Sequence, residues 1–188
     1  KRVALLEIDY SFSGKNVMLR GVTTSAEAKT VLLKELAKKG YTVMDCLKVL
    51  PDGKDLEGKT YGIINVSVAN LRVSPDFSSE MMTQGLMGMP VRVLQRDGWI
   101  RIQTPDDYIA WVHRVGVHPV TKEEMAAWNS AEKIVVTAHY GFVYSEPSQT
   151  SQTISDVAAG NRLRWEGSKG AFYLSLIHIS EPTRRTPI

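Results

Sequence analysis

The feature that most constrains this fold is an internal repeat with a constant offset of 72 residues. A register without gaps, running over strand-like and turn-like segments, indicates two copies of one small fold that each bury a core. The paired positions are Ile63 and Val135, Leu71 and Val143, Pro75 and Pro147, Gly88 and Gly160, and Val93 and Trp165.

The first copy, residues 61–117, alternates short apolar strands with turn clusters, which is typical of a small barrel. Tight turns are expected at Asp97–Gly98 and at Thr104–Asp107. Apolar residues recur at spacing two, at Val91, Val93, Ile100, Ile102, Ile109 and Trp111. We therefore predict a closed barrel whose interior is filled by Val91, Val93, Ile102 and Trp111.

The second copy, residues 131–173, is expected to be truncated, because the offset would carry a complete copy to about residue 184. A barrel without its last strands would expose unpaired edges.

Residues 118–130 are predicted to be a helical linker that begins with a capping box at Thr121 and Glu124. Its Met125 and Trp128 can wedge between neighbouring elements.

Residues 1–60 predict a different unit, with the order ββαβ. Two aliphatic runs, 3–10 and 17–22, form a hairpin, and a further strand covers 41–50. Thr24 and Glu27 predict the start of the intervening helix. One helix face is expected to be apolar, with Ala28, Val31, Leu32 and Leu36. The wording of 17–40 is loosely similar to BON-type modules of bacterial envelope proteins, and a generic α/β packing unit is an equal alternative.

The last fifteen residues, 174–188, read as the translation of an adapter oligonucleotide from DNA sequencing libraries. Reverse translation of Leu174 to Arg184 fits that adapter codon by codon. Segments of this kind are excluded from fold reasoning, so we expect native sequence to stop near Tyr173 and His178 to be no ligand. The chain is then a fragment at both ends.

Charge and cysteine content exclude several classes of protein. A net charge of +3 is too small and too evenly spread for a nucleic-acid-binding surface. A single cysteine excludes an internal disulfide framework and a thiolate zinc site, and no cofactor is indicated. No apolar run approaches the roughly 20 residues of a membrane span. Membrane contact would need an export signal or lipid anchor upstream of Lys1.

Three groups of candidate residues are set aside. Asp45 and Cys46 lack the Ser and Gly of a DCSG nucleophile motif, and Cys46 falls in a predicted strand, which indicates a buried structural thiol. The histidines have no metal-ligand spacing. The aromatic residues could form a binding surface, but regularly spaced barrel aromatics more often fill cores, and most of these are expected to do so. These histidines are His113, His118 and His139, and the aromatics are Trp99, Trp111, Tyr140 and Trp165.

Two segments of the chain resemble domains of a known protein family. Residues 70–112, including SSEMMTQGLMG and GWIRIQTPDDYIAW, are similar to the first bacterial SH3 (SH3b) domain of NlpC/p60-type cysteine peptidases of the cell envelope. Residues 131–173 resemble their second. The resemblance implies a mainly β fold of two tandem SH3-like barrels, the second truncated, behind the ββαβ unit. It further implies a missing papain-like domain that cleaves γ-D-glutamyl-diamino acid bonds in peptidoglycan stem peptides.

Two positions match residues that this family uses to bind substrate: Glu80 in SSEM and Tyr108 in DDYIAW. A carboxylate and a hydroxyl suit the free L-alanine ammonium at the start of a stem peptide. A solvated surface glutamate and a half-buried barrel tyrosine are the alternative interpretations. The usual DGYxGW wording has glycines where this chain has Asp107 and Ala110. No catalytic residue is expected within the fragment.

Two functions remain open. The chain is either the substrate-positioning half of a peptidoglycan endopeptidase, exported to the bacterial envelope or periplasm, or a stand-alone module that binds wall polymer or a protein. A catalytic motif downstream of codon 173 would distinguish them. A membrane-surface role ranks last, because the predicted helix lacks a strong basic and apolar face.

Overall fold

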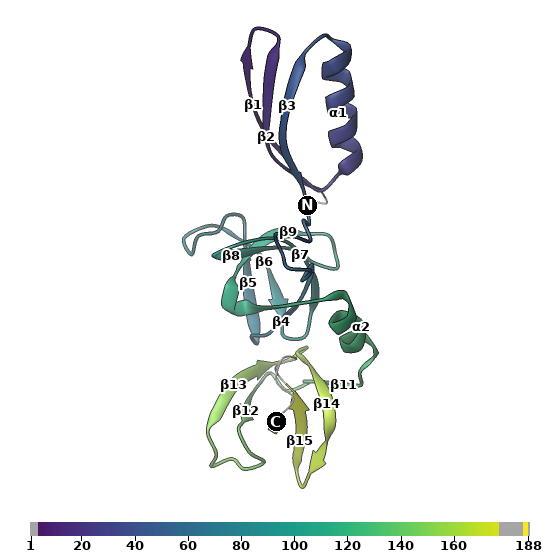
Figure 1. Cartoon of the computed structure of the whole chain (residues 1–188). Helices are drawn as coiled ribbons and strands as arrows, with labels where there is room; N and C mark the ends of the chain where they lie inside the picture. Colours follow the sequence, from purple (N-terminus) through teal and green to yellow (C-terminus); the bar gives the residue numbers. More distant parts are fainter. Residues whose placement is uncertain (1–3, 177–185, 188) are drawn as a thin grey trace.

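The computed structural model describes residues 4–176 and 186–187, in three units that follow one another along the chain (Figure 1). We call them the N-terminal unit (residues 4–50), the first repeat (residues 61–120) and the second repeat (residues 133–176). Most of the regular structure is strand, in several sheets, with two α-helices. The expected fold class, mainly β with a small α/β unit, is confirmed.

The N-terminal unit is a three-stranded sheet with one helix against it (Figure 1). Strand β1 (Leu6–Ser13) pairs antiparallel with β2 (Asn16–Thr23), and β3 (Thr42–Val49) lies parallel to β2. Helix α1 (Ala26–Lys38) makes the crossover that a parallel pair requires. Residues of β2 and β3 that face the helix form a small core, comprising Val17, Leu19 and Leu47 with Leu32, Leu33 and Leu36.

Two details of the helix differ from the prediction. Ser25, not Thr24, is the N-cap, and its hydroxyl accepts a hydrogen bond from the Ala28 N–H at 3.0 Å. Thr24 instead accepts from the Leu5 N–H at 2.9 Å, so its side chain holds the strand that enters the unit. The apolar face is also rotated, because Val31 is 54% exposed while Leu33 packs on the sheet.

The N-terminal unit is attached to the first repeat by an apolar cluster and a charged pair. Leu5, Leu50, Leu94 and Ile109 are buried together where the two units meet. Beside them, the Arg101 guanidinium donates to both carboxylate oxygens of Glu7, at 2.9 and 2.5 Å. Arg101 is only 5% exposed, so the N-terminal unit covers a charge that the first repeat alone would leave in water.

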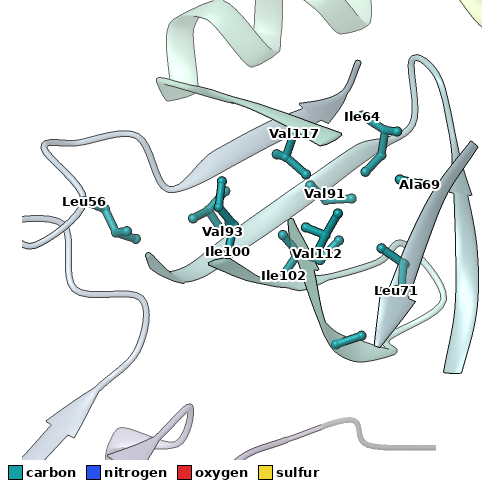
Figure 2. Close-up of a cluster of buried hydrophobic side chains, with 11 residues drawn as sticks. Leu56, Ile64, Ala69, Leu71, Val91, Val93, Ile100, Ile102, Val112 and Val117 are labelled. Carbon is teal, nitrogen blue, oxygen red and sulfur yellow. The ribbon is translucent and has the colours of Figure 1, made fainter. Parts of the chain in front are cut away.

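The first repeat is one seven-stranded sheet that curls around a core (Figure 2). The strand order is β10-β4-β7-β8-β9-β5-β6. Val93 and Ile102, from the neighbouring strands β7 and β8, are fully buried at its centre. The strands are β4 (Tyr61–Ile64), β5 (Val68–Arg72), β6 (Met81–Leu86), β7 (Pro90–Asp97), β8 (Trp99–Gln103), β9 (Ile109–His113) and β10 (Val117–Val120), with a 3-10 turn, η1 (Arg114–Gly116), before β10.

Strand β9 presents the opposite face from the one predicted. Ala110 and Val112 enter the core, whereas Trp111 lies outside it with the Arg101 guanidinium 5.0 Å from its ring centre. Ile109 belongs to the cluster under the N-terminal unit. Because side chains alternate along a strand, choosing the wrong phase exchanges every residue between the two faces. The prediction that Trp111 fills the barrel is therefore wrong.

Helix α2 (Lys122–Ser130) connects the repeats, and a capping box forms at its start as expected. The Thr121 hydroxyl accepts from the Glu124 N–H at 3.3 Å, while the Glu124 carboxylate accepts from the Thr121 N–H at 2.8 Å. Met125 and Trp128 are buried against Ile63 and Val120. The segment thus packs on the first repeat along its length. Neither described helix is long and apolar enough to cross a membrane.

The second repeat follows the first at the offset of 72. The Gly88 N–H donates to Ile64 O at 2.8 Å, and the Gly160 N–H donates to Val136 O at the same distance. Both glycines have positive φ, 83° and 88°. The strands are β11 (Lys133–Val135), β12 (Tyr140–Tyr144), β13 (Thr153–Ala158), β14 (Arg162–Lys169) and β15 (Phe172–Leu176).

The two repeats share a packed interface. Met87 of the first repeat is 3% exposed and packs with Val143, Val157 and Leu163 of the second. The Arg162 N–H donates to Met87 O at 2.9 Å. Two further hydrogen bonds join Ser67 to Asn161 and to Asp156, at 2.8 and 2.7 Å.

The tail attributed to an adapter falls largely outside the described residues, which omit 177–185 and 188. Its first residues complete β15, and a two-residue strand, β16 (Thr186–Pro187), pairs with them. Ser175 pairs with Trp165 as Ile102 pairs with Val93, so a buried serine stands where the first repeat has a core isoleucine. The origin of this segment stays a prediction.

Candidate functional site

Glu80 is the last residue of the loop that joins β5 to β6, residues 73–80, which we call the 73–80 loop. Its carbonyl oxygen accepts a hydrogen bond from the Val73 N–H at 3.1 Å, which closes the base of the loop. The side chain is exposed, and among the described contacts its carboxylate has no hydrogen bond or ion pair. A carboxylate in this setting is available to a cationic ligand.

Tyr108 ends the turn between β8 and β9 and is half-buried. Thr104 fixes its backbone, since the Thr104 N–H donates to Tyr108 O at 2.9 Å and the Thr104 hydroxyl accepts from the Tyr108 N–H at 3.0 Å. Asp107 adopts φ 68°, a left-handed conformation that aspartate tolerates in place of glycine. Ala110 is buried in the core, where its small side chain leaves β9 in regular pairing with β8.

The two predicted residues lie at the same end of the first repeat, on either side of β5. Arg72, the last residue of β5, pairs with Met81 of β6 and with Trp111 of β9. Strands β6 and β9 both run antiparallel to β5 and therefore in the same direction. Glu80 and Tyr108 each precede the first residue of one of these strands, so both are displayed at the rim where β5 ends.

A cleft with both apolar and charged lining adjoins the Tyr108 turn on its other side. It has a volume of about 290 Å³ and lies between the first repeat and α2. Arg92 and Asp107 contribute charges of opposite sign, and Asn129 contributes an amide. The Arg92 guanidinium also donates to the Gln103 side chain at 3.2 Å. A ligand in this cleft would touch the turn that carries Tyr108.

Aromatic residues gather on the first repeat at a site that the sequence did not reveal. The rings of Phe77, Trp99 and His113 contact one another, with centroid separations of 4.9 Å, 5.1 Å and 5.3 Å. They line a cavity of about 190 Å³, which we call the aromatic groove. Its other walls include Val66, Val68, Asn70, Arg72 and Val115. Two features of the sequence point to it: Trp99, one of the aromatics considered as a binding surface, and Phe77, an aromatic residue in the turn-rich segment PDFSS.

The expectation that most of the barrel aromatics fill cores is wrong. Trp99 and Trp111 are half-buried, and Tyr140 and Trp165 are 60% and 44% exposed. For Trp99 and Trp111 the cause is the alternation of side chains along a strand, since their neighbours Ile100 and Val112 take the interior positions. In the second repeat, Tyr140, Phe142 and Tyr144 follow one another on the outer face of β12, with adjacent rings 5.0 and 6.4 Å apart.

The structure also locates Cys46 and the side chains that could bind a metal ion. Cys46 is exposed rather than buried, because it lies on the face of the sheet that α1 does not cover. Leu47 takes the covered face. Within residues 4–176, no group of three or more His, Cys, Asp or Glu side chains is placed to hold a metal ion.

Comparison with known families and structures gives the first repeat a relationship. Residues 71–115 match a family model described as the bacterial dipeptidyl-peptidase Sh3 domain. A search of curated proteins finds no match to the chain. The first repeat is therefore similar to a bacterial SH3 domain, and Glu80 and Tyr108 both lie within the matched segment.

Two solved structures resemble the chain in fold. An NlpC/P60 family protein from Bacillus cereus ATCC 10987 is 18% identical with a TM-score of 0.52, over 68% of this chain and 53% of that one. An NlpC/P60 endopeptidase from Photobacterium damselae subsp. piscicida is 11% identical with a TM-score of 0.50, over 88% and 37%. This chain thus spans about half the length of the Bacillus protein. The likeness shows a shared fold.

Proposed function

We propose that the chain is the substrate-positioning and targeting part of an envelope peptidoglycan endopeptidase that cleaves γ-D-glutamyl-diamino acid bonds in stem peptides. In this proposal both repeats are SH3-like barrels, and a cysteine-peptidase domain outside the chain performs the chemistry. The protein would act in the bacterial envelope, periplasmic or exported. The SH3 match and the fold similarity to NlpC/P60 proteins support the assignment.

The observation that carries the proposal is the placement of Glu80 and Tyr108 at one rim of the first repeat. A stem peptide begins with L-alanine, whose ammonium is a compact cation with three donors. The Glu80 carboxylate, exposed and without a described partner, can accept from that ammonium in a charge-assisted hydrogen bond. The Tyr108 hydroxyl can accept a second hydrogen bond from the same ammonium.

Both residues are held by backbone contacts rather than by each other. The Val73 to Glu80 hydrogen bond fixes one side of the rim, and the Thr104 to Tyr108 pair fixes the other. Such preorganisation limits the conformational entropy that a ligand would otherwise have to overcome on binding. The proposed role of this rim is to recognise the free end of the peptide while a separate domain attacks the bond.

The test uses the full-length protein encoded by the native gene. We expect Glu80→Gln and Tyr108→Phe to lower kcat/KM for a stem peptide with a free L-alanine by roughly tenfold to a hundredfold, because each loses a contact worth about 1 to 3 kcal/mol. Acetylating the peptide amine should reproduce most of the Glu80→Gln defect in the wild-type protein.

Asp97→Asn is a matched control, since it removes an exposed carboxylate from the β7–β8 turn of the same repeat. It should leave kcat/KM unchanged. If both rim variants cleave the free peptide as well as the wild type does, the first repeat is a tether and the proposed site is wrong. If the native gene encodes no catalytic domain beyond the chain, the alternative of a stand-alone binding module replaces the endopeptidase.

A further inference from the structure

The 73–80 loop is built to hold an exposed phenylalanine in place. The Asp76 carboxylate accepts from both the Ser78 N–H, at 2.7 Å, and the Ser78 hydroxyl, at 2.8 Å, on the two sides of Phe77. The Arg72 guanidinium also donates to Ser79 O at 2.5 Å. Phe77 nevertheless remains 67% exposed, so its ring is held without being buried.

The second repeat shows that the loop does not need this ring to fold. Its residues 145–152 repeat the backbone hydrogen bonds of the 73–80 loop, with Ser145 N–H to Gln152 O at 2.8 Å and Ser148 N–H to Glu146 O at 2.7 Å. The position 72 residues after Phe77 is Gln149, which is exposed. Phe77 is therefore an addition to a loop that is stable without it, which is the pattern expected of a ligand-contacting residue.

The aromatic groove forms where two strands separate. Strands β5 and β9 are paired only at Arg72 and Trp111, and beyond this pair the groove lies between them. A cavity of about 190 Å³ is smaller than the roughly 300 to 1,000 Å³ of sites for drug-sized ligands. It accommodates one ring rather than a long segment of polymer.

The polar groups of the groove are mainly donors. The Asn70 carbonyl accepts from the Gln84 amide at 2.9 Å, which leaves the Asn70 N–H groups to donate. The Arg72 guanidinium retains donors beyond the one given to Ser79. No carboxylate is among the described residues that line the groove. Its chemistry suits a ligand with an apolar face and several acceptor oxygens, and disfavours a cation.

We propose that the aromatic groove binds an N-acetylated amino sugar of a glycan strand. A pyranose ring presents an apolar C–H face for Phe77 and Trp99, and its acetamide and hydroxyl oxygens can accept from Asn70 and Arg72. The choice of an N-acetylated sugar rests on the proposed cell-wall function. The groove would hold a glycan strand of the wall, while the rim at Glu80 and Tyr108 receives a separate stem peptide, because a peptide still attached to its sugar has no free L-alanine ammonium.

The experiment titrates a soluble oligomer of N-acetylglucosamine into the chain and follows binding by NMR chemical shifts. We expect saturable shifts at Phe77, Trp99 and His113. Phe77→Ala should weaken binding about threefold to tenfold, the usual contribution of one aromatic contact. Phe77→Tyr should retain binding, because it keeps the ring. Gln149→Ala, the equivalent change in the second repeat, should have no effect.

Three outcomes would overturn the proposal: no saturable binding, equal binding by folded Phe77→Ala, or equal binding of a glucose oligomer that lacks acetamide groups. Groove shifts produced by a free stem peptide instead of the sugar would also overturn it. The Glu80→Gln variant separates this inference from the proposed function. Sugar binding that survives in Glu80→Gln, alongside unchanged peptide cleavage, would show that the rim assignment fails while the groove assignment holds.

Discussion

Gly88 and Arg162 meet so closely that a Cβ at residue 88 would lie 2.2 Å from the Arg162 carbonyl oxygen. Gly88 belongs to the first repeat and Arg162 to the second. The two repeats can pack this closely only because residue 88 has no side chain. Gly160, at the equivalent turn of the second repeat, has the Leu86 side chain 2.9 Å from its own Cβ position.

Gly88→Ala is therefore expected to force the repeats apart. Alanine at φ 83° costs about 1 to 2 kcal/mol from backbone strain, and the contact with Arg162 adds about 1 to 3 kcal/mol of overpacking. Gly98→Ala is the matched control, because Gly98 has φ 67° with nothing near its Cβ position. Thermal unfolding should show a clearly larger loss for Gly88→Ala, and equal losses would contradict the interface.

Val93→Asp should unfold the first repeat. Val93 is fully buried among apolar side chains, and a carboxylate there would lack any partner. The expected cost is about 3 to 5 kcal/mol or more. Val68→Asp places the same charge on the solvent side of β5, where Val68 is 39% exposed, and should cost little. An unchanged melting temperature for Val93→Asp, measured by circular dichroism, would show that the assigned core is wrong.

Glu7→Ala should loosen the N-terminal unit from the first repeat. Arg101 is buried and donates two hydrogen bonds to Glu7, so the substitution leaves a covered cation without its carboxylate. We expect a loss of about 1 to 3 kcal/mol, less than for a wholly buried pair because the Glu7 side chain is 47% exposed. A double-mutant cycle with Arg101→Met measures the coupling, and a coupling of zero would argue against a structural role.

Acid should release Phe77 from the groove. The hydrogen bonds from the Ser78 N–H and hydroxyl hold the pKa of Asp76 below its ordinary value of 3.8. A carboxyl group whose pKa is lowered by folding contributes stability above its unfolded pKa, and that contribution is lost as the pH falls through the folded value. The Ser78 amide and the Phe77 ring signals should therefore shift together in an NMR titration below about pH 4.

Asp76→Asn separates charge from geometry in the same titration. Asparagine keeps an oxygen that accepts from Ser78 but cannot be protonated, so the acid transition should vanish while the loop remains ordered. Asp76→Ala should disorder the loop at every pH. A transition that persists in Asp76→Asn would assign it to another group.

The repeat, the turns and the element order could be predicted because each depends on local chemistry. Gly98 and Asp107 lie in the expected tight turns with positive φ, and Thr121 caps its helix as expected. Glu80 and Tyr108 were placed by motif, and the structure brings both to one rim. Their role in binding stays a prediction.

Which face of β9 enters the barrel core could not be predicted, because Ile109 and Trp111 have larger apolar side chains than Ala110. Burial under the N-terminal unit gives Ile109 a different core to enter, and Arg101 covers Trp111. Periodicity identifies two faces of a strand but not which neighbour will cover each one. The aromatic groove was missed for a related reason. Trp99 and His113 meet as partners on the neighbouring strands β8 and β9, and Phe77, which is distant in the sequence, reaches them only when the 73–80 loop folds over the barrel.

Met87 makes the core of the second repeat depend on the first repeat. Because this side chain completes the interior of the second repeat, a polypeptide that starts at residue 131 would carry a hole where the thioether belongs. Its exposed lining of Val143, Val157 and Leu163 would favour self-association over a soluble monomer. Gene duplication or domain shuffling that transferred the second repeat alone would therefore give a domain with an incomplete core.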